Sequence, residues 1–205
     1  MRSIKDAPFQ ARKVPLHFRV VKELVRRGAD IDLWDEDHHT PLCAAATQRH
    51  LSALRFFLEQ YQARGGEELK RALSHPCRKE GKNHSLLGHV FSGCTMAESA
   101  PLDIIRYLVQ GWGADIWGAT EIRRKSTVGA TVSQCLPLHD AVTYGDLAAT
   151  TFFIEECGMP VNTSAGVLKF NPLHADCLSA EPEPEILPVV KYLVEEKGAD
   201  VTLQT

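Results

Sequence analysis

Apolar residues recur three and four positions apart in several segments of the chain, and this spacing is typical of a helix that buries one face. Four segments show it: Val20, Val21, Leu24 and Val25; Leu54, Phe57 and Leu58; Ile104, Ile105, Leu108 and Val109; and Val189, Val190, Leu193 and Val194. Glycines stand where such helices would end, at Gly28, Gly113, Gly158 and Gly198. The residue after a helix often adopts a left-handed conformation that favours glycine, so the pattern predicts helix ends at these positions.

A second set of positions predicts where helices begin. Proline is tolerated in the first turn of a helix, so Pro8, Pro41, Pro137 and Pro172 are interpreted as helix starts, and Thr40 can cap the helix at Pro41. Leu42 precedes the apolar pair Phe57–Leu58 by 15 and 16 residues. Leu138 precedes Phe153–Ile154, and Phe9 precedes Leu24–Val25, by the same offsets. Three segments therefore share one helix–turn–helix length.

The opening strings T-P-L-C-A-A at 40–45, L-P-L-H at 136–139 and N-P-L-H at 171–174, and the closing strings of the G-A-D-I type, resemble the signatures of the ankyrin repeat family. That family builds each unit of about 33 residues from a β-turn and two antiparallel helices. The resemblance implies an all-α fold, a helix–turn–helix repeat solenoid with β-hairpin fingers. It divides a single domain, 1–205, into five units and two insertions: units 7–32, 33–61, 83–116, 134–162 and 169–201, and insertions 62–82 and 117–133.

The departures from a regular repeat carry their own predictions. The first half of insertion 62–82 can lengthen a helix before Pro76. Insertion 117–133 alternates β-branched and polar residues around Gly129, which predicts an extended hairpin. The prolines at 182 and 184 are expected to exclude a helix from residues 180–185.

Composition narrows the class of protein. A chain of 205 residues with 44% hydrophobic and 24% charged residues is a globular composition rather than a disordered one. The net charge of −3 gives no general attraction to nucleic acid or anionic membranes. No apolar stretch is long enough for a membrane span, and no secretory signal is recognisable. Six scattered cysteines then favour reduced thiols and a cytoplasmic or nuclear location.

The resemblance implies a function in protein–protein interaction, because the family presents its fingers and first helices as a concave binding surface. Its variable positions correspond here to Trp34, Glu36, His39, Thr47, Gln48, Thr143 and Tyr144. Trp34 is the leading candidate, since an aromatic residue at a finger tip beside Asp35, Glu36 and Asp37 has the composition of a binding hot spot. The alternative is that Trp34 packs against a neighbouring finger.

Basic residues are concentrated in the insertions. Arg123, Arg124 and Lys125 lie together in the second insertion, and residues 62–84 hold six basic against three acidic side chains. These two groups could meet an acidic peptide or a phosphate, or they could be ordinary solvated loops. Nucleic acid binding is not expected, since no aromatic platform or recognition motif accompanies them.

Metal binding and catalysis find little support in the sequence. His75, Cys77, His84, His89 and Cys94 fall close together but match no paired zinc spacing except one H-x4-H element, so no metal or cofactor is expected. The resemblance implies a structural role for His139 and His174. No catalytic motif is recognisable.

The alternative function is a small-molecule or catalytic pocket built by the insertions, with candidate residues His75, Cys77, Arg123, His139 and Tyr144. Further repeats could follow Thr205.

Overall fold

A computed structural model describes residues 16–36, 39–74, 77–79, 82–92, 102–126, 129–165, 169, 171–176 and 183–202. The described part is mostly helical. Several residues singled out in the sequence lie outside it, among them Pro8, Phe9, Asp37, His75 and Cys94. The helices are α1 (Leu16–Arg26), α2 (Pro41–Thr47), α3 (Leu51–Arg64), α4 (Gly66–Ser74), α5 (Leu86–Ser92), α6 (Leu102–Arg106), α7 (Pro137–Thr143), α8 (Leu147–Thr151), α9 (Pro172–Asp176) and α10 (Glu183–Lys191).

Three of these helices continue directly into a wider π-helical turn. The turn Tyr107–Gly111 extends α6, Phe152–Glu156 extends α8, and Tyr192–Glu196 extends α10. Each extended helix then ends at a glycine, as the sequence predicts. The φ angles of Gly28, Gly113, Gly158 and Gly198 are all positive, between 66° and 93°.

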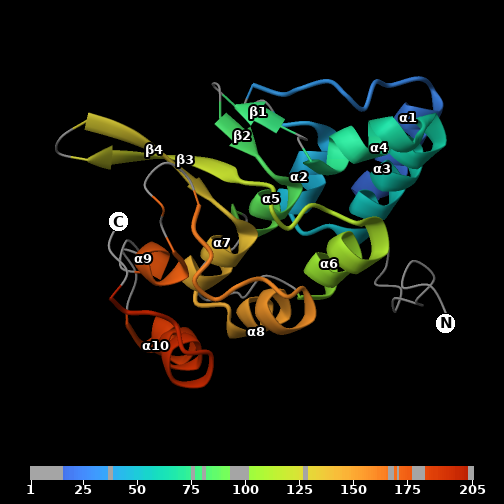
Figure 1. Ribbon diagram of the computed structural model, residues 1–205. Helices are drawn as coiled ribbons and strands as arrows, with labels where there is room; N and C mark the ends of the chain where they lie inside the picture. The colour runs from blue at the N-terminus through green and yellow to red at the C-terminus, as the bar shows by residue number, and fades with distance from the viewer. Residues whose placement is uncertain are drawn as a thin grey trace.

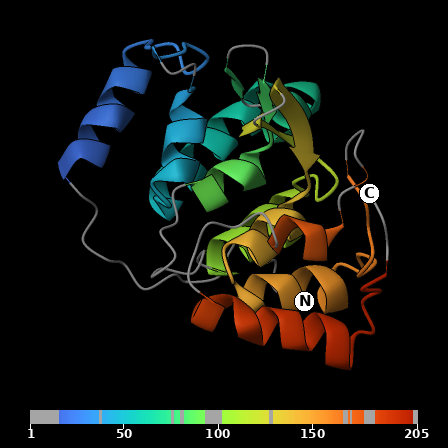
Figure 2. The same cartoon turned by 90° about the vertical axis from the view of Figure 1, so that its left-hand side faces the viewer.

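The helices form two adjoining rows. The short helices α2, α5, α7 and α9 lie side by side in chain order, and longer helices pack behind them, α3 against α2 and α8 against α7. The helices α6 and α10 both contact α8. The rows run from α1 at one end of the molecule to α10 at the other (Figures 1 and 2).

The starts of the short helices follow from local chemistry. The side-chain oxygen of Thr40 accepts a hydrogen bond from the amide of Cys43, and that of Asn171 accepts one from the amide of His174. The Nδ1 atoms of His139 and His174 in turn accept hydrogen bonds from the backbone amides of Leu136 and Asn171. These bonds satisfy amides that a helix start leaves without partners, so both histidines stabilise helix ends.

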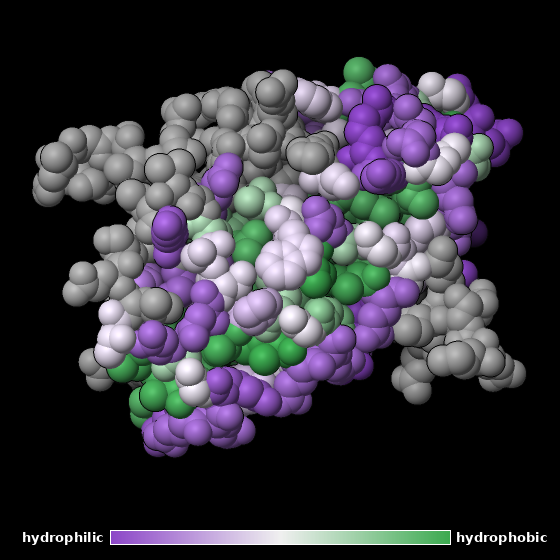
Figure 3. All heavy atoms as spheres, viewed as in Figure 1, coloured by the Kyte–Doolittle hydropathy of each residue, from purple (hydrophilic) through white to green (hydrophobic). Residues whose placement is uncertain are grey.

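The core lies between the two rows. Phe91 of α5 and Phe153 of the extended α8 are fully buried, and their ring centroids lie 6.4 Å apart. Leu54, Leu108 and Leu193 of the longer helices are also fully buried. In Figure 3, apolar surface gathers in a band across the middle of the face shown, with hydrophilic residues along the margins. Within the described residues, no helix is both long and apolar enough to cross a membrane.

Two antiparallel hairpins accompany the helices. The strands β1 (Cys77–Lys79) and β2 (Lys82–His84) form a short one. The strands β3 (Thr120–Ser126) and β4 (Gly129–Cys135) form a longer one that projects beyond the helices (Figure 1). The extended hairpin predicted from the alternation in insertion 117–133 is therefore confirmed.

Three expectations need correction or refinement. The helix α10 begins at Glu183, so the exclusion of helix from residues 180–185 is wrong for its last three positions, because Pro184 falls in the first turn, where proline costs no hydrogen bond. The first insertion extends α3 to Arg64 and then, after Gly65, adds the separate helix α4. The sequence predicts reduced thiols, and Cys135 and Cys157 are free, but Cys43 is disulfide-bonded. Sequence spacing does not show which thiols the fold brings together, so this bond was not predicted.

Candidate interaction surface

Between α1 and α2, the described residues 30–36 and 39–40 form a finger. A carboxylate oxygen of Asp30 accepts a hydrogen bond from the amide of Asp32 at 2.9 Å. Asp35 closes the tip, because its carboxylate accepts from the amide of His39 at 2.8 Å and its amide donates to the carbonyl of His39 at 3.1 Å. Side chains on this finger are thus held by local hydrogen bonds within the loop.

The base of the finger is fixed to α3. The hydroxyl of Tyr61 donates to the carboxylate of Asp32 at 2.8 Å and to the carbonyl of Ile31 at 3.2 Å. The guanidinium of Arg64 lies 2.5 Å from the same carboxylate. Burial raises the pKa of Tyr61, and the neighbouring Asp32 raises it further, so the phenol remains a hydrogen-bond donor at neutral pH.

Trp34 lies at the rim of a hollow between the finger and α4. The hollow has a volume of about 310 Å³, and Thr40, Tyr61 and Arg71 also line it. Trp34 keeps 52% of its surface exposed. We call this feature the Trp34 hollow. Its far wall comes from the first insertion, since Arg71 belongs to α4.

His39 and Thr47 both contact His89 of α5. The ring of His39 packs edge-on against that of His89, with centroids 5.2 Å apart. The Nδ1 atom of His89 lies 3.5 Å from the hydroxyl of Thr47, and the Nδ1 atom of His39 lies 3.9 Å from the carboxylate of Asp35. The finger and the end of α2 are therefore joined through the side chain of His89.

The other predicted positions on the helices separate into two environments. Tyr144, directly after α7, stacks on Phe91 with a centroid distance of 6.4 Å and an interplanar angle of 14°. Thr143, at the end of α7, is half-buried. Glu36 on the finger is exposed, and Gln48 is exposed at the end of α2, where it borders an apolar cleft next to α1. The predicted residues thus do not converge on one point.

The basic residues of the second insertion are neighbours in one strand. Arg123, Arg124 and Lys125 are consecutive in β3, opposite Val132, Thr131 and Ala130 of β4.

Two basic residues of the first insertion form ion pairs. Arg64 pairs with Asp32, and Arg71 pairs with Glu68. Lys70 is exposed on α4. Pairing of this kind lowers the attraction of the insertion for an acidic ligand.

Sequence reasoning missed Trp117. It lies six residues after the π-helical turn Tyr107–Gly111 that extends α6, and 51% of its surface is exposed. Its amide donates to the carboxylate of Asp115 at 2.9 Å, an Asx turn like that of Asp30 and Asp32. Its place shortly after the string Gly113-Ala114-Asp115, in a predicted finger, is a signal that could have found it.

The residues proposed for a catalytic pocket do not form one where their side chains are described. His139 is fully buried and accepts a hydrogen bond from the amide of Leu136, and Tyr144 stacks on Phe91. The side chains of His75, Cys77 and Arg123 lie outside the described part. Among the described residues, no group of three histidine, cysteine or acidic side chains could hold a metal ion.

No protein-family model matches this sequence. A comparison with curated proteins finds no relative.

Proposed function

We propose that this chain is a module that binds another protein, built in the manner of ankyrin repeats and using its fingers and short helices as the contact surface. Four observations support the repeat architecture: the row of α2, α5, α7 and α9, the longer helices behind them, the proline starts and the glycine ends. A solenoid of this kind offers a large rigid surface, so little conformational entropy is lost on binding.

The observation that carries the proposal is the Trp34 hollow. A half-exposed tryptophan stands on a finger that hydrogen bonds hold in shape, beside a cavity large enough for one side chain of a partner. Tryptophan is one of the residue types enriched among energetic hot spots, which cluster in well-packed pockets.

The surroundings of the hollow define the partner. Leu42 and Ala72 give it apolar walls, and Arg71 adds a cation at its edge. The partner therefore inserts an apolar or aromatic side chain against Trp34, while Arg71 is already paired with Glu68. A cytoplasmic or nuclear location remains a prediction of the sequence.

Affinity capture from cell lysate with quantitative mass spectrometry tests the proposal. The Trp34→Ala variant should lose a specific captured protein by at least tenfold, because removal of a hot-spot tryptophan costs about 2 kcal/mol or more. Leu187→Ala is the matched control, since Leu187 is a large apolar residue with 51% of its surface exposed on α10. Equal capture by wild type and Trp34→Ala, with both chains folded by circular dichroism, would refute the proposal.

A further inference from the structure

The two ends of the helix rows carry opposite charge. From the start of α1 to Gly28 the chain holds four Lys or Arg residues and one acidic residue. From the start of α10 to Gly198 it holds four acidic residues and two lysines. Residues 1–15, which precede α1, have the same sign as α1, with four Lys or Arg residues against one acidic residue. Since α1 and α10 stand at opposite ends of the molecule (Figures 1 and 2), the chain has a basic end and an acidic end.

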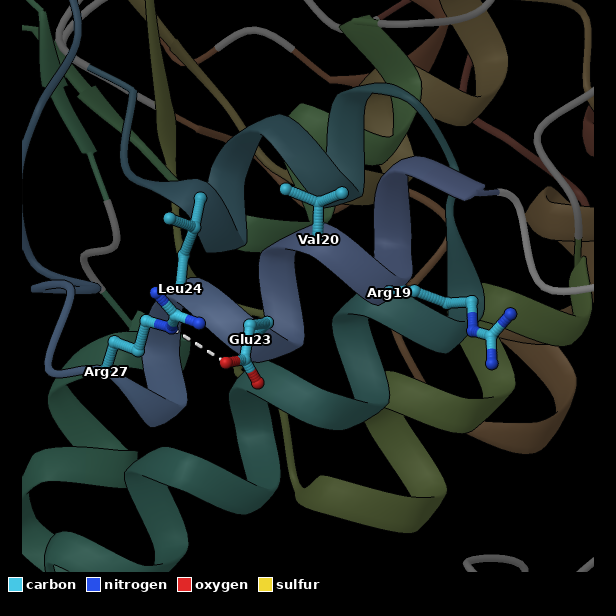
Figure 4. A pocket seen from close by; sticks show the side chains of 5 residues that line it. All are labelled: Arg19, Val20, Glu23, Leu24 and Arg27. Atoms are coloured by element: carbon cyan, nitrogen blue, oxygen red, sulfur yellow. Dashed lines mark hydrogen bonds and ion pairs between the residues drawn. The ribbon is translucent and has the colours of Figure 1, made fainter.

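The basic end also exposes apolar side chains. Val20 and Leu24 of α1 are 54% and 52% exposed, and together with Arg19, Glu23 and Arg27 they line a hollow on this helix. Figure 4 shows Val20 and Leu24 on the same side of α1, with Glu23 bonded to Arg27. The surface of α1 thus combines two apolar side chains with more cations than anions.

The acidic end exposes apolar side chains of similar size. Leu187 of α10 is 51% exposed, and Val201 is 69% exposed. Val201 follows a Gly-Ala-Asp string as Ile31 does, yet Ile31 is only 2% exposed. Ile31 is in contact with α3, whereas no helix follows Val201 within the described residues. The acidic end therefore presents an apolar surface of the kind that the next pair of helices covers elsewhere in the chain.

Inside the chain, polar contacts join successive long helices at a recurring sequence position. In α6, α8 and α10 with their π-helical turns, the residue directly after the last apolar pair is Gln110, Glu155 or Glu195. The amide of Gln110 donates to Glu156 of the extended α8 at 3.2 Å. Glu155 forms an ion pair of 2.6 Å with Lys197, directly after the extended α10. This position therefore contacts the next long helix in chain order.

The same series predicts a contact between the two ends. Glu195 is exposed and has on α10 the position of Gln110 and Glu155. Arg27 has, relative to α1, the position that Glu156 has on the extended α8, the second residue after the apolar pair. A second copy stacked as the next unit would therefore bring the carboxylate of Glu195 to the guanidinium of Arg27. The exposed apolar side chains of the two ends would meet in the same contact.

We propose that this chain associates head to tail with copies of itself, the α10 end of one copy on the α1 end of the next. The apolar side chains supply the contact, and the opposite charges set the order, because two basic ends or two acidic ends repel each other. A nucleic acid or an anionic membrane would cover the basic end alone, whereas a second copy covers each end with the other. Such a contact joins different surfaces of the two copies, so it builds open chains or closed rings.

Sedimentation analysis of the full chain tests the proposal. The average mass should rise with concentration at about 0.02 M salt, and association should be at least tenfold weaker at about 0.5 M salt, which screens exposed charges. Glu195→Lys and Arg27→Glu should each weaken association at least tenfold. The double variant should recover it, because the two charges are then exchanged.

Mixtures of blocked variants test the head-to-tail order. Val20→Asp blocks the α1 end and Leu187→Asp blocks the α10 end, so each variant alone should stay monomeric. Mixed together, they should form a dimer that does not grow, because each copy keeps one intact end. Leu147→Asp is the matched control, since Leu147 is 38% exposed and has on α8, inside the row, the position of Leu187. It should associate as the wild type does.

Several results would overturn the proposal, with every variant shown to be folded by circular dichroism. A chain that is monomeric at both salt concentrations would do so, as would unchanged association of Glu195→Lys. Self-association of Leu187→Asp alone would identify a symmetric contact between α1 ends, and self-association of Val20→Asp alone would identify one between α10 ends. Trp34→Ala should associate as the wild type does, so this test is independent of the Trp34 hollow.

Discussion

The hydroxyl of Tyr61 is expected to stabilise the fold by holding the finger to α3, and Tyr61→Phe removes that hydroxyl alone. The hydroxyl donates to the carboxylate of Asp32 at 2.8 Å and to the carbonyl of Ile31 at 3.2 Å. A hydrogen bond to a charged group contributes about 1.5–3 kcal/mol, but Asp32 is partly exposed and keeps Arg64. We therefore expect a loss of about 1 kcal/mol in the free energy of unfolding, or about 2–4 °C in Tm.

The assay is urea denaturation followed by circular dichroism, arranged as a double-mutant cycle. Tyr61→Phe and Asp32→Ala are measured singly and together, and the coupling energy isolates the bond between them. Tyr192→Phe is the matched control, because the hydroxyl of Tyr192 donates at 3.2 Å to the carboxylate of Glu155. Glu155 is exposed, so the control should lose less than Tyr61→Phe. A coupling energy of zero would refute the view that this bond holds the finger.

The same residue gives a pH dependence. Burial and Asp32 raise the pKa of Tyr61 above its ordinary value of 10.0. The folded chain therefore holds this proton to higher pH than the unfolded chain does. The resulting stability is fully present below pH 10 and is lost as pH rises through the folded pKa. In Tyr61→Phe the free energy of unfolding, measured by urea denaturation above pH 10, should fall less with rising pH, because the phenol of Tyr61 no longer contributes.

Three further predictions concern packing, a helix end and a thiol. Phe153→Ala should lower the free energy of unfolding by about 3–5 kcal/mol in urea denaturation, since the ring is fully buried, and a loss below 1 kcal/mol would contradict its place in the core. Gly113→Ala should lower the free energy of unfolding by about 1 kcal/mol, because the φ of Gly113 is 71° and alanine is strained there. Gly66→Ala, in the first turn of α4, is the control and should not destabilise the fold. Equal shifts of Tm in the two variants would contradict the backbone strain at Gly113. Burial and Glu156 raise the pKa of Cys157, so its alkylation at pH 8, followed by mass spectrometry, should be slower than that of a free thiol and should accelerate on unfolding.

The sequence predicted the parts of the fold that depend on local chemistry. Thr40 caps a helix start because its hydroxyl reaches the amide of Cys43 three residues on. Gly113 ends a helix because its own backbone takes a positive φ. The β3–β4 hairpin follows from alternation within one short segment. None of these features needs a contact between distant parts of the chain.

The candidate site was harder to predict because its walls come from distant segments. Trp34 was found from its place at a finger tip, but Arg71 of the insertion closes the hollow beside it. The pairing of Arg64 with Asp32 joins residues 32 positions apart, so the sequence does not show which charge of the insertion is paired.

The helix α1 shows where a periodic pattern alone misleads. Its apolar spacing is the same as that of the other long helices, yet Val20 and Leu24 are half exposed, because burial depends on a neighbour and the place beside α2 is a cleft. A pattern predicts which face of a helix is apolar, and only the packing shows whether something covers that face.

The finger residues 30–34 border two hollows of the surface. Asp30 and Ile31 line the apolar cleft next to α1, and Asp32 and Trp34 line the Trp34 hollow. Tyr61 bonds to Ile31 and Asp32, so one anchored segment forms part of both walls.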